Sequence, residues 1–281
     1  MAFLKMNGLG NDFVVIDARH DGAAPGPAQI RRIADRRLGV GCDQLIVMEA
    51  AEAPADLFMR IFNPDGSEAE ACGNATRCVA RLVGEETGRR EVAVRTVAGL
   101  LHTWLLDDGR VTVDMGEPRF GWADIPLAEE MSTLKLDIPV GPLDSPELSD
   151  PCAVNMGNPH CIFFVRDITG HRLEDLGPLL EHHHLFPQRT NVELAQIIAP
   201  DRIRLRVWER GTGITPACGS GACATAVAAV RRGLTERHMT IEVDGGELTI
   251  EWAPGDHVLM TGPVALNFRG ELDPGLLAAA E

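Results

Sequence analysis

Short apolar runs separated by turn residues dominate the first half of the chain and predict strands interrupted by two helices. Helical periodicity predicts helices over 28–38 and from Cys72 to about Gly88. Strands are expected at 12–17, 44–48, 58–62, 92–97, 100–106 and 111–115. The run Asn7-Gly8-Leu9-Gly10-Asn11 is expected to form a glycine-rich turn before the first of them.

The second half repeats this order of elements. Helices are expected over 173–184 and from Cys218 to about Gly233. Strands are expected at 152–156, 161–165, 191–197, 203–208, 239–243, 247–252 and 258–260. Residues 119–150 are rich in Pro, Gly and Asp and are interpreted as a crossover between the two halves.

The two halves also match residue by residue. Ala71-Cys72-Gly73 and Ala217-Cys218-Gly219 each open an apolar helix and lie 146 positions apart. At nearly the same offset, Gly10-Asn11 falls on Gly157-Asn158 and Gln44 falls on Asn191. This agreement indicates an internal duplication. We therefore expect an N-terminal domain of residues 1–118 completed by 263–281 and a C-terminal domain of residues 119–262, packed around a pseudo-two-fold axis.

Composition is that of an ordinary globular protein. The chain has 281 residues, of which 45% are hydrophobic and 24% charged. Its formal net charge of −15 argues against nucleic acid or an anionic membrane as a partner. The start, Met1 to Gly8, lacks the apolar core of a signal peptide. Seven widely spread cysteines with no Cys-x-x-Cys pair suggest reduced thiols, a cytoplasmic location and no metal site.

Cys72 and Cys218 are the strongest candidates for chemistry. Each thiol is predicted to lie at a helix N-terminus, where unpaired N–H groups and the macrodipole favour negative charge. We therefore expect each thiol to lose its proton more readily than a free cysteine. The same N–H groups are suited to bind a carboxylate, and the run Gly219-Ser220-Gly221 lets a ligand approach the backbone closely.

Two equivalent thiols suit one kind of reaction in particular. A pseudo-two-fold axis would place them on opposite sides of one point, which is what inversion of a stereocentre requires. One group removes the α-proton and the other returns a proton to the opposite face. Lys5 and Lys135, the two lysines of the chain, lie in no convincing pyridoxal phosphate site, so the chemistry is expected to need no cofactor.

Several motifs, taken together, resemble the diaminopimelate epimerase family over nearly the whole chain. They are Asn7 to Asp12, Gly41 to Gln44, Asn63 to Ser67, Cys72 to Asn74, Asn155 to His160, Glu209 to Gly211 and Ala217 to Gly221. The resemblance implies an α+β fold of two pseudo-symmetric domains, each a curved, mostly antiparallel, barrel-like sheet around a central helix. It also implies an active site in the cleft between them, a homodimer, and interconversion of LL- and meso-diaminopimelate in lysine and cell-wall precursor synthesis.

The resemblance also implies roles for individual residues. Cys72 and Cys218 would be the two bases, with His160 and Glu209 tuning the cysteines or the α-ammonium group. The reacting carboxylate would be bound by Gly73, Asn74, Gly219 and Ser220. The amino groups and the distal carboxylate would be held by Asn11, Gln44, Asn63, Asn158, Asn191, Glu209 and Arg210.

Other interpretations stand beside this one. A cysteine at a helix start is often a small buried residue, and His160 is also compatible with a structural role. The competing functions are another isomerase of this architecture, such as a proline racemase or a phenazine-type isomerase, and a non-catalytic amino-acid binding protein. The other five cysteines are expected to pack in the core: Cys42, Cys78, Cys152, Cys161 and Cys223.

Overall fold

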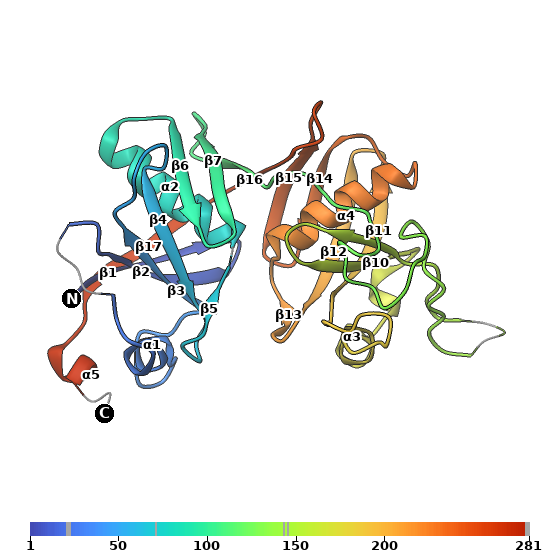
Figure 1. Cartoon of the computed structure of the whole chain (residues 1–281), viewed down its shortest axis with the longest axis horizontal. Coiled ribbons are helices and arrows are strands. Elements are labelled where there is room, and N and C mark those ends of the chain that lie inside the picture. Colours follow the sequence, from blue (N-terminus) through green and yellow to red (C-terminus); the bar gives the residue numbers. More distant parts are fainter. Residues whose placement is uncertain (21–23, 71, 143, 145, 279–281) are drawn as a thin grey trace. The chain divides into compact units, whose positions relative to one another are not determined.

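The chain forms two compact units, each with its own apolar core. A computed structural model describes residues 1–20, 24–70, 72–142, 144 and 146–278. One unit comprises 1–113 with 262–281, and the other comprises 114–261 (Figure 1). Ala71 of the first cysteine motif, residues 143 and 145 of the expected crossover and residues 279–281 lie outside the described residues.

The first unit is an open, mostly antiparallel sheet. Its strands are β1 (Ala2–Gly8), β2 (Asn11–Asp17), β3 (Gln44–Glu49), β4 (Leu57–Phe62), β5 (Glu68–Ala69), β6 (Glu91–Thr96), β7 (Gly99–Leu105), β8 (Val111–Asp114) and β17 (Ala265–Glu271). They pair in the order β17-β1-β2-β3-β4-β6-β7-β8, with β5 beside β4. The pairs β2–β3 and β4–β6 are parallel.

The second unit repeats the same topology. Its strands are β9 (Cys152–Asn155), β10 (Pro159–Val165), β11 (Asn191–Ala199), β12 (Arg202–Glu209), β13 (Gly213–Thr215), β14 (His238–Val243), β15 (Gly246–Trp252) and β16 (Val258–Gly262). They pair in the order β9-β10-β11-β12-β14-β15-β16, with β13 beside β12. The pairs β10–β11 and β12–β14 are again the parallel ones, which confirms the predicted duplication.

The register in which the strands pair identifies equivalent residues in the two units. Phe13 on β2 lies opposite Gln44 on β3, and His160 on β10 lies opposite Asn191 on β11. Two residues after Gln44, β3 carries Ile46. Two residues after Asn191, at the equivalent position, β11 carries Glu193. Equivalent positions therefore hold apolar side chains in one unit and ionisable ones in the other.

A long helix packs against the sheet of each unit (Figure 1). The helices of the first unit are α1 (Pro27–Ala34), α2 (Gly73–Thr87) and α5 (Pro274–Ala278), and those of the second are η1 (Ile168–Gly170), α3 (Leu173–Glu181) and α4 (Gly219–Arg231). Helix α2 contacts β1, β6 and β7, and α4 contacts β9, β10, β11, β14 and β15. The predicted fold class, α+β with mostly antiparallel sheets around a central helix, is confirmed, and within the described residues neither sheet closes into a barrel.

Apolar residues on nearly every side of α4 explain its burial. From Ala222 to Ala229 every residue is shielded from solvent, including Cys223. A helix that is apolar all round must be enclosed by other elements. Cys78 in α2 is buried in the same way, and so are Cys42, Cys152 and Cys161, as expected. Within the described part of the chain, no helix has the length and apolarity needed to cross a membrane.

Two predicted helices are shorter than expected. Helix α1 ends at Ala34 instead of residue 38, because the Asp35 carboxylate accepts hydrogen bonds from the N–H groups of Arg37 and Leu38 at 2.7 and 2.8 Å. Such side-chain bonds compete with the helical pattern. Helix α3 ends at Glu181 instead of residue 184, and His182 follows as its C-terminal cap residue.

Three strands of the first unit were not predicted: β1, the two-residue β5 and β17. Strand β1 carries the buried Lys5, which interrupts its apolar pattern, and β17 pairs with β1 at the edge of the sheet. The expected turn over residues 7–11 is narrower in the structure. Only Leu9 and Gly10 form the bend, with φ angles of 58° and 83°. Two positive φ angles in a row are typical of the tight hairpin turn that matches strand twist.

We expect Gly84→Ala to destabilise the first unit. A Cβ at this position of α2 would lie 2.4 Å from Leu105 Cδ2 and 2.9 Å from the Arg89 carbonyl oxygen. Overpacking should outweigh the better helix propensity of alanine and lower the free energy of unfolding by about 1–2 kcal/mol. Urea denaturation measures this change. Gly170→Ala is the control, because a Cβ added at Gly170 would have no atom within 4 Å. Equal free energies of unfolding for the two variants would contradict the packing explanation.

Candidate functional site

Cys72 is the residue immediately before helix α2. Its φ and ψ of −151° and 106° are extended, and its carbonyl accepts hydrogen bonds from Thr76 N and Thr76 Oγ1, both at 2.9 Å. The thiol is half-buried, with Sγ 3.9 Å from Asn11 Oδ1. Gly73 and Asn74 form the buried first turn. As predicted, the sequence thus sets this thiol at a helix N-terminus.

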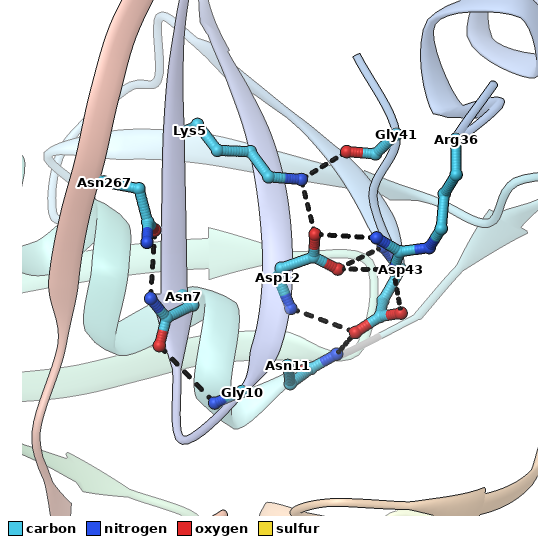
Figure 2. Close-up of polar contacts among 9 residues, drawn as sticks. All are labelled: Lys5, Asn7, Gly10, Asn11, Asp12, Arg36, Gly41, Asp43 and Asn267. Carbon is cyan, nitrogen blue, oxygen red and sulfur yellow. Dashed lines mark hydrogen bonds and ion pairs between the residues drawn. The ribbon is translucent and has the colours of Figure 1, made fainter. Parts of the chain in front are cut away.

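Asn11 is held from both ends of its carboxamide. Its Oδ1 accepts a hydrogen bond from Asn74 Nδ2 at 3.2 Å, and its Nδ2 donates to Asp43 Oδ2 at 2.9 Å. Figure 2 shows Asn11 and Asp43 meeting where β2 begins and where the chain enters β3. Cys72, Asn74 and Asn11 are therefore brought together in the first unit, and Asp43 fixes the orientation of the Asn11 carboxamide.

A charged network supports Asp43. Arg36 Nη2 contacts Asp43 Oδ1 and Asp12 Oδ1, each at 2.7 Å, and Lys5 Nζ donates to Asp12 and to the Gly41 carbonyl (Figure 2). Burial by itself would raise the pKa of Asp12, but hydrogen bonds and charge from Arg36 and Lys5 lower it well below its ordinary value. Asp12 is therefore a carboxylate over the whole neutral range.

Gln44 and Asn63 form a second amide pair in this unit. Gln44 Nε2 donates to Asn63 Oδ1 at 3.3 Å, and Asn63 Nδ2 donates to Ser67 Oγ at 3.1 Å. Both amides are half-buried, at the start of β3 and just after β4. The pair offers neutral hydrogen-bonding groups and no charge of its own.

Cys218 is the equivalent residue before helix α4. It also has extended φ and ψ, −117° and 113°, and its carbonyl accepts a hydrogen bond from Ala222 N at 3.0 Å. The thiol is only 5% exposed. Its Sγ accepts a hydrogen bond from Gly221 N at 3.4 Å and lies 3.5 Å from Ser220 Oγ. Gly219 is buried in the first turn and Ser220 is half-buried.

The prediction of a readily ionised Cys218 is wrong. Burial raises the pKa of the Cys218 thiol well above its ordinary value, and negative charge at Glu209 and Glu193 raises it further. The Gly221 N–H and the Ser220 side chain act in the opposite direction but do not outweigh these effects. Cys218 is therefore a protonated thiol at neutral pH and is suited to donate a proton.

Glu209 and Arg210 follow one another at the end of β12. Thr215 Oγ1 donates a hydrogen bond to Glu209 Oε1, and burial raises the pKa of Glu209. Arg210 N donates to Asn191 Oδ1 at 2.9 Å, and Asn191 Nδ2 donates to the Pro159 carbonyl at 2.8 Å. The Arg210 guanidinium is exposed, with Nη1 3.2 Å from the Gln188 carbonyl oxygen.

His160 is fully buried between two polar partners. Its Nδ1 lies 2.6 Å from Glu193 Oε1 and its Nε2 lies 2.8 Å from Asn158 Oδ1. Glu193 is also fully buried, and burial raises its pKa. Charge at His160 and Glu193 influences Glu209, so the ionisable groups of this unit form one connected cluster beside Cys218.

Sequence reasoning missed Glu193, Asp43 and Thr215. Asp43 lies within a quoted motif, but its contact with Asn11 depends on the close approach of two chain segments. A comparison of the two repeats would have found Glu193, because its position in β11 corresponds to Ile46 in β3. An ionisable residue at the buried position of a duplicated strand is a signal for a role beyond packing.

Each group of residues has a defined chemical capacity. The first unit offers a half-buried thiol, the N-terminus of α2 and neutral amides. The second offers a protonated thiol, the N-terminus of α4, a cluster of carboxyl and imidazole groups and an exposed guanidinium. Helix N-termini bind carboxylates, and thiols exchange protons.

The chain is similar to known proteins over nearly its whole length. The family model described as Diaminopimelate epimerase matches residues 3–121 and 152–267. A diaminopimelate epimerase of Rhodospirillum centenum is 61% identical over 98% of this chain and 93% of its own length. One from Acidiphilium cryptum is 57% identical over 98% of both chains.

Solved structures share the fold at low sequence identity. A phenazine biosynthesis protein of Enterococcus faecalis has a TM-score of 0.69 with 16% identity, over 97% of this chain and 98% of its own. A probable proline racemase of Agrobacterium radiobacter has a TM-score of 0.67 with 16% identity, over 98% of this chain and 95% of its own. These two likenesses concern the fold alone.

We expect Lys5→Met to destabilise the protein by roughly 3 kcal/mol at pH 7, because it leaves the Asp12 carboxylate short of a buried cation. Since the folded pKa of Asp12 is depressed, its stabilisation is complete above the unfolded pKa of about 3.9 and is lost as the pH falls through the folded value. The difference between wild type and variant should therefore shrink in acid. Urea denaturation at several pH values measures it, and a difference that stays constant down to pH ~2 would argue against this pairing.

We also expect Glu209→Gln to lower the pKa of Cys218, because it removes a negative charge beside the thiol. Alkylation of Cys218 by iodoacetamide, followed by mass spectrometry across a pH series, reports the thiolate fraction. The midpoint of the rate profile should lie at lower pH in the variant than in wild type. An unchanged midpoint would show that Glu209 does not act on this thiol.

Proposed function

The chain belongs to the diaminopimelate epimerase family, and we propose that it interconverts LL- and meso-2,6-diaminopimelate by moving protons between the substrate α-carbon and two cysteines. The observation that carries the proposal is the repeated placement of a cysteine before the central helix of each unit. Only a reaction that needs two equivalent groups makes use of both positions.

The two thiols would share the work as base and acid. In one direction the thiolate of Cys72 removes the α-proton, and the Cys218 thiol donates a proton to the opposite face. The raised pKa of Cys218 supports its role as the initial donor in that direction. In the reverse direction the cysteines exchange roles, and each turnover leaves one thiol and one thiolate.

The substrate carboxylate beside the reacting carbon would bind at the helix N-termini. Gly73 and Asn74 in one unit and Gly219 and Ser220 in the other form the first turn of a helix, where the macrodipole and the direction of the backbone N–H groups favour an anion. They would also stabilise the negative charge that spreads onto the carboxylate when the α-proton leaves. Arg210 is suited to the distal carboxylate because its guanidinium is exposed and bidentate.

The amides and the ionisable cluster would recognise the rest of the substrate. We assign Asn11, Gln44, Asn63, Asn158 and Asn191 to the amino groups and the distal carboxylate, and Glu209 to the α-ammonium group. His160 acts beside them through Asn158. We further propose that the enzyme acts without a cofactor, as a homodimer in the cytoplasm.

We expect wild-type protein in D2O to incorporate deuterium at the α-carbon of diaminopimelate with no added cofactor. Cys72→Ala and Cys218→Ala should each lower the rate of epimerisation by about 100- to 10,000-fold, because one face of the carbon loses its proton carrier. Mass spectrometry of the substrate and chromatographic separation of the stereoisomers measure the two effects.

Cys152→Ala is the matched control, since Cys152 is a buried cysteine outside the candidate site. It should retain most of the activity. Full epimerase activity in either of the other two variants would refute the mechanism, and absence of exchange in folded, reduced wild type would refute the proposed reaction.

A further inference from the structure

The pair of His160 and Glu193 is an unusual feature of the second core. Both side chains have 0% exposure, and Nδ1 and Oε1 are 2.6 Å apart. Within the described part of the chain, Glu193 Oε2 accepts no hydrogen bond. Burying a carboxyl group with an incomplete set of hydrogen-bond partners lowers the stability of the fold. Its presence therefore suggests a role other than packing.

The hydrogen bonds of His160 have a defined direction. Asn158 Oδ1, which lies 2.8 Å from Nε2, is only an acceptor, so Nε2 must carry a hydrogen. At Nδ1 a single proton is shared with Glu193: either a carboxylate accepts from an imidazolium, or a protonated carboxyl group donates to a neutral ring. In both states Nε2 remains the donor to Asn158.

We propose that Glu193 is a positioning residue that acts through His160 to hold the Asn158 carboxamide with its oxygen toward the imidazole and its Nδ2 end toward the substrate. This inference rests on the proposed function, which assigns Asn158 to substrate binding. Without a polar partner at Nδ1, the imidazole is free to adopt the other tautomer. Its Nε2 would then present a lone pair to Asn158, and the carboxamide would lose this orientation.

A comparison with the first unit supports the positioning role of Glu193. The positions of His160 and Glu193 are occupied there by Phe13 and Ile46, both fully buried. Its equivalent asparagine, Asn11, receives its orientation from Asp43 instead. The fold therefore accommodates an apolar pair at these positions, and the polar pair in the second unit is not required for packing.

Glu193 also lies under the first turn of α4. A Cβ at Gly221 would come within 2.9 Å of Glu193 Oε1 and 3.3 Å of Cys218 Sγ. A side chain at residue 221 would thus displace the carboxyl group or the thiol. The partial positive charge of the helix N-terminus makes this a tolerable place for a buried acid. The close approach of Glu193 to Gly221 places the His160–Glu193 pair beside the helix that begins at Cys218.

The test compares two substitutions of Glu193. Glu193→Gln keeps the size, and its Nε2 can donate to Nδ1 of His160, so that His160 Nε2 still donates to Asn158. Its KM for diaminopimelate should stay within about threefold of wild type. Glu193→Leu removes the partner and imitates the apolar first unit. Its KM should rise roughly tenfold or more, because Asn158 loses its orientation already in the ground state.

Leu194→Ala is the matched control for a purely structural effect. Leu194 is buried on the same strand but packs in the core on the other side of β11. This variant should lower Tm and leave KM unchanged. A KM in Glu193→Leu equal to that of wild type, or a rise in KM for Leu194→Ala as large as for Glu193→Leu, would overturn the proposal.

A spectroscopic measurement decides the matter independently of activity. In ¹⁵N-histidine-labelled protein, with His160 assigned by comparison with His160→Phe, Nε2 should carry the proton in wild type and in Glu193→Gln. An unprotonated Nε2 in wild type would overturn the proposal even if Glu193→Leu failed to fold. If wild type catalysed no α-proton exchange, the proposed function would fall, whereas the NMR result would still report on the hydrogen-bond chain.

Discussion

The buried N-terminus of the central helix is the constraint on which the rest of the molecule depends. A helix begins with N–H groups that it cannot satisfy itself, and both α2 and α4 place these groups beside a cysteine and small residues. Such a start is stable in a core only when side chains, water or a ligand partner the free donors. The sheets, which are repeated strand for strand, hold each helix in this position.

The same scaffold carries different chemistry in its two copies. Where the first unit has Phe13 and Ile46, the second has His160 and Glu193. Cys72 is half-buried beside an amide, whereas Cys218 is buried beside carboxyl groups that raise its pKa. A reversible transfer between two faces needs one protonated and one deprotonated base at the start of each turnover, and this asymmetry is suited to establish it.

Much of the fold follows from the sequence because strand and helix periodicity are local, and the repeat doubles the signal. The errors occur where a single side chain changes the outcome. The buried charge of Lys5 concealed β1, and the Asp35 carboxylate ended α1 early. Neither effect is visible in an apolar pattern, since each depends on contacts made by one polar group.

The candidate site was also predicted only in part from the sequence. Both cysteines and the residues of the first helical turns were found because their motifs are contiguous in sequence. The direction in which the pKa of Cys218 shifts was not predicted correctly, because it depends on burial and on carboxyl groups from two other strands. Electrostatics of this kind arise from tertiary packing and cannot be obtained from a helix position alone.

The central claim is that two sulfurs address opposite faces of one α-carbon. A crystal structure of the protein with diaminopimelate bound tests it most directly, through the distances from Cys72 Sγ and Cys218 Sγ to that carbon. The account predicts both sulfurs at about 3.5 Å, one on each side of the carbon. A bound substrate with one sulfur remote from the α-carbon, or with both on the same face, would contradict it.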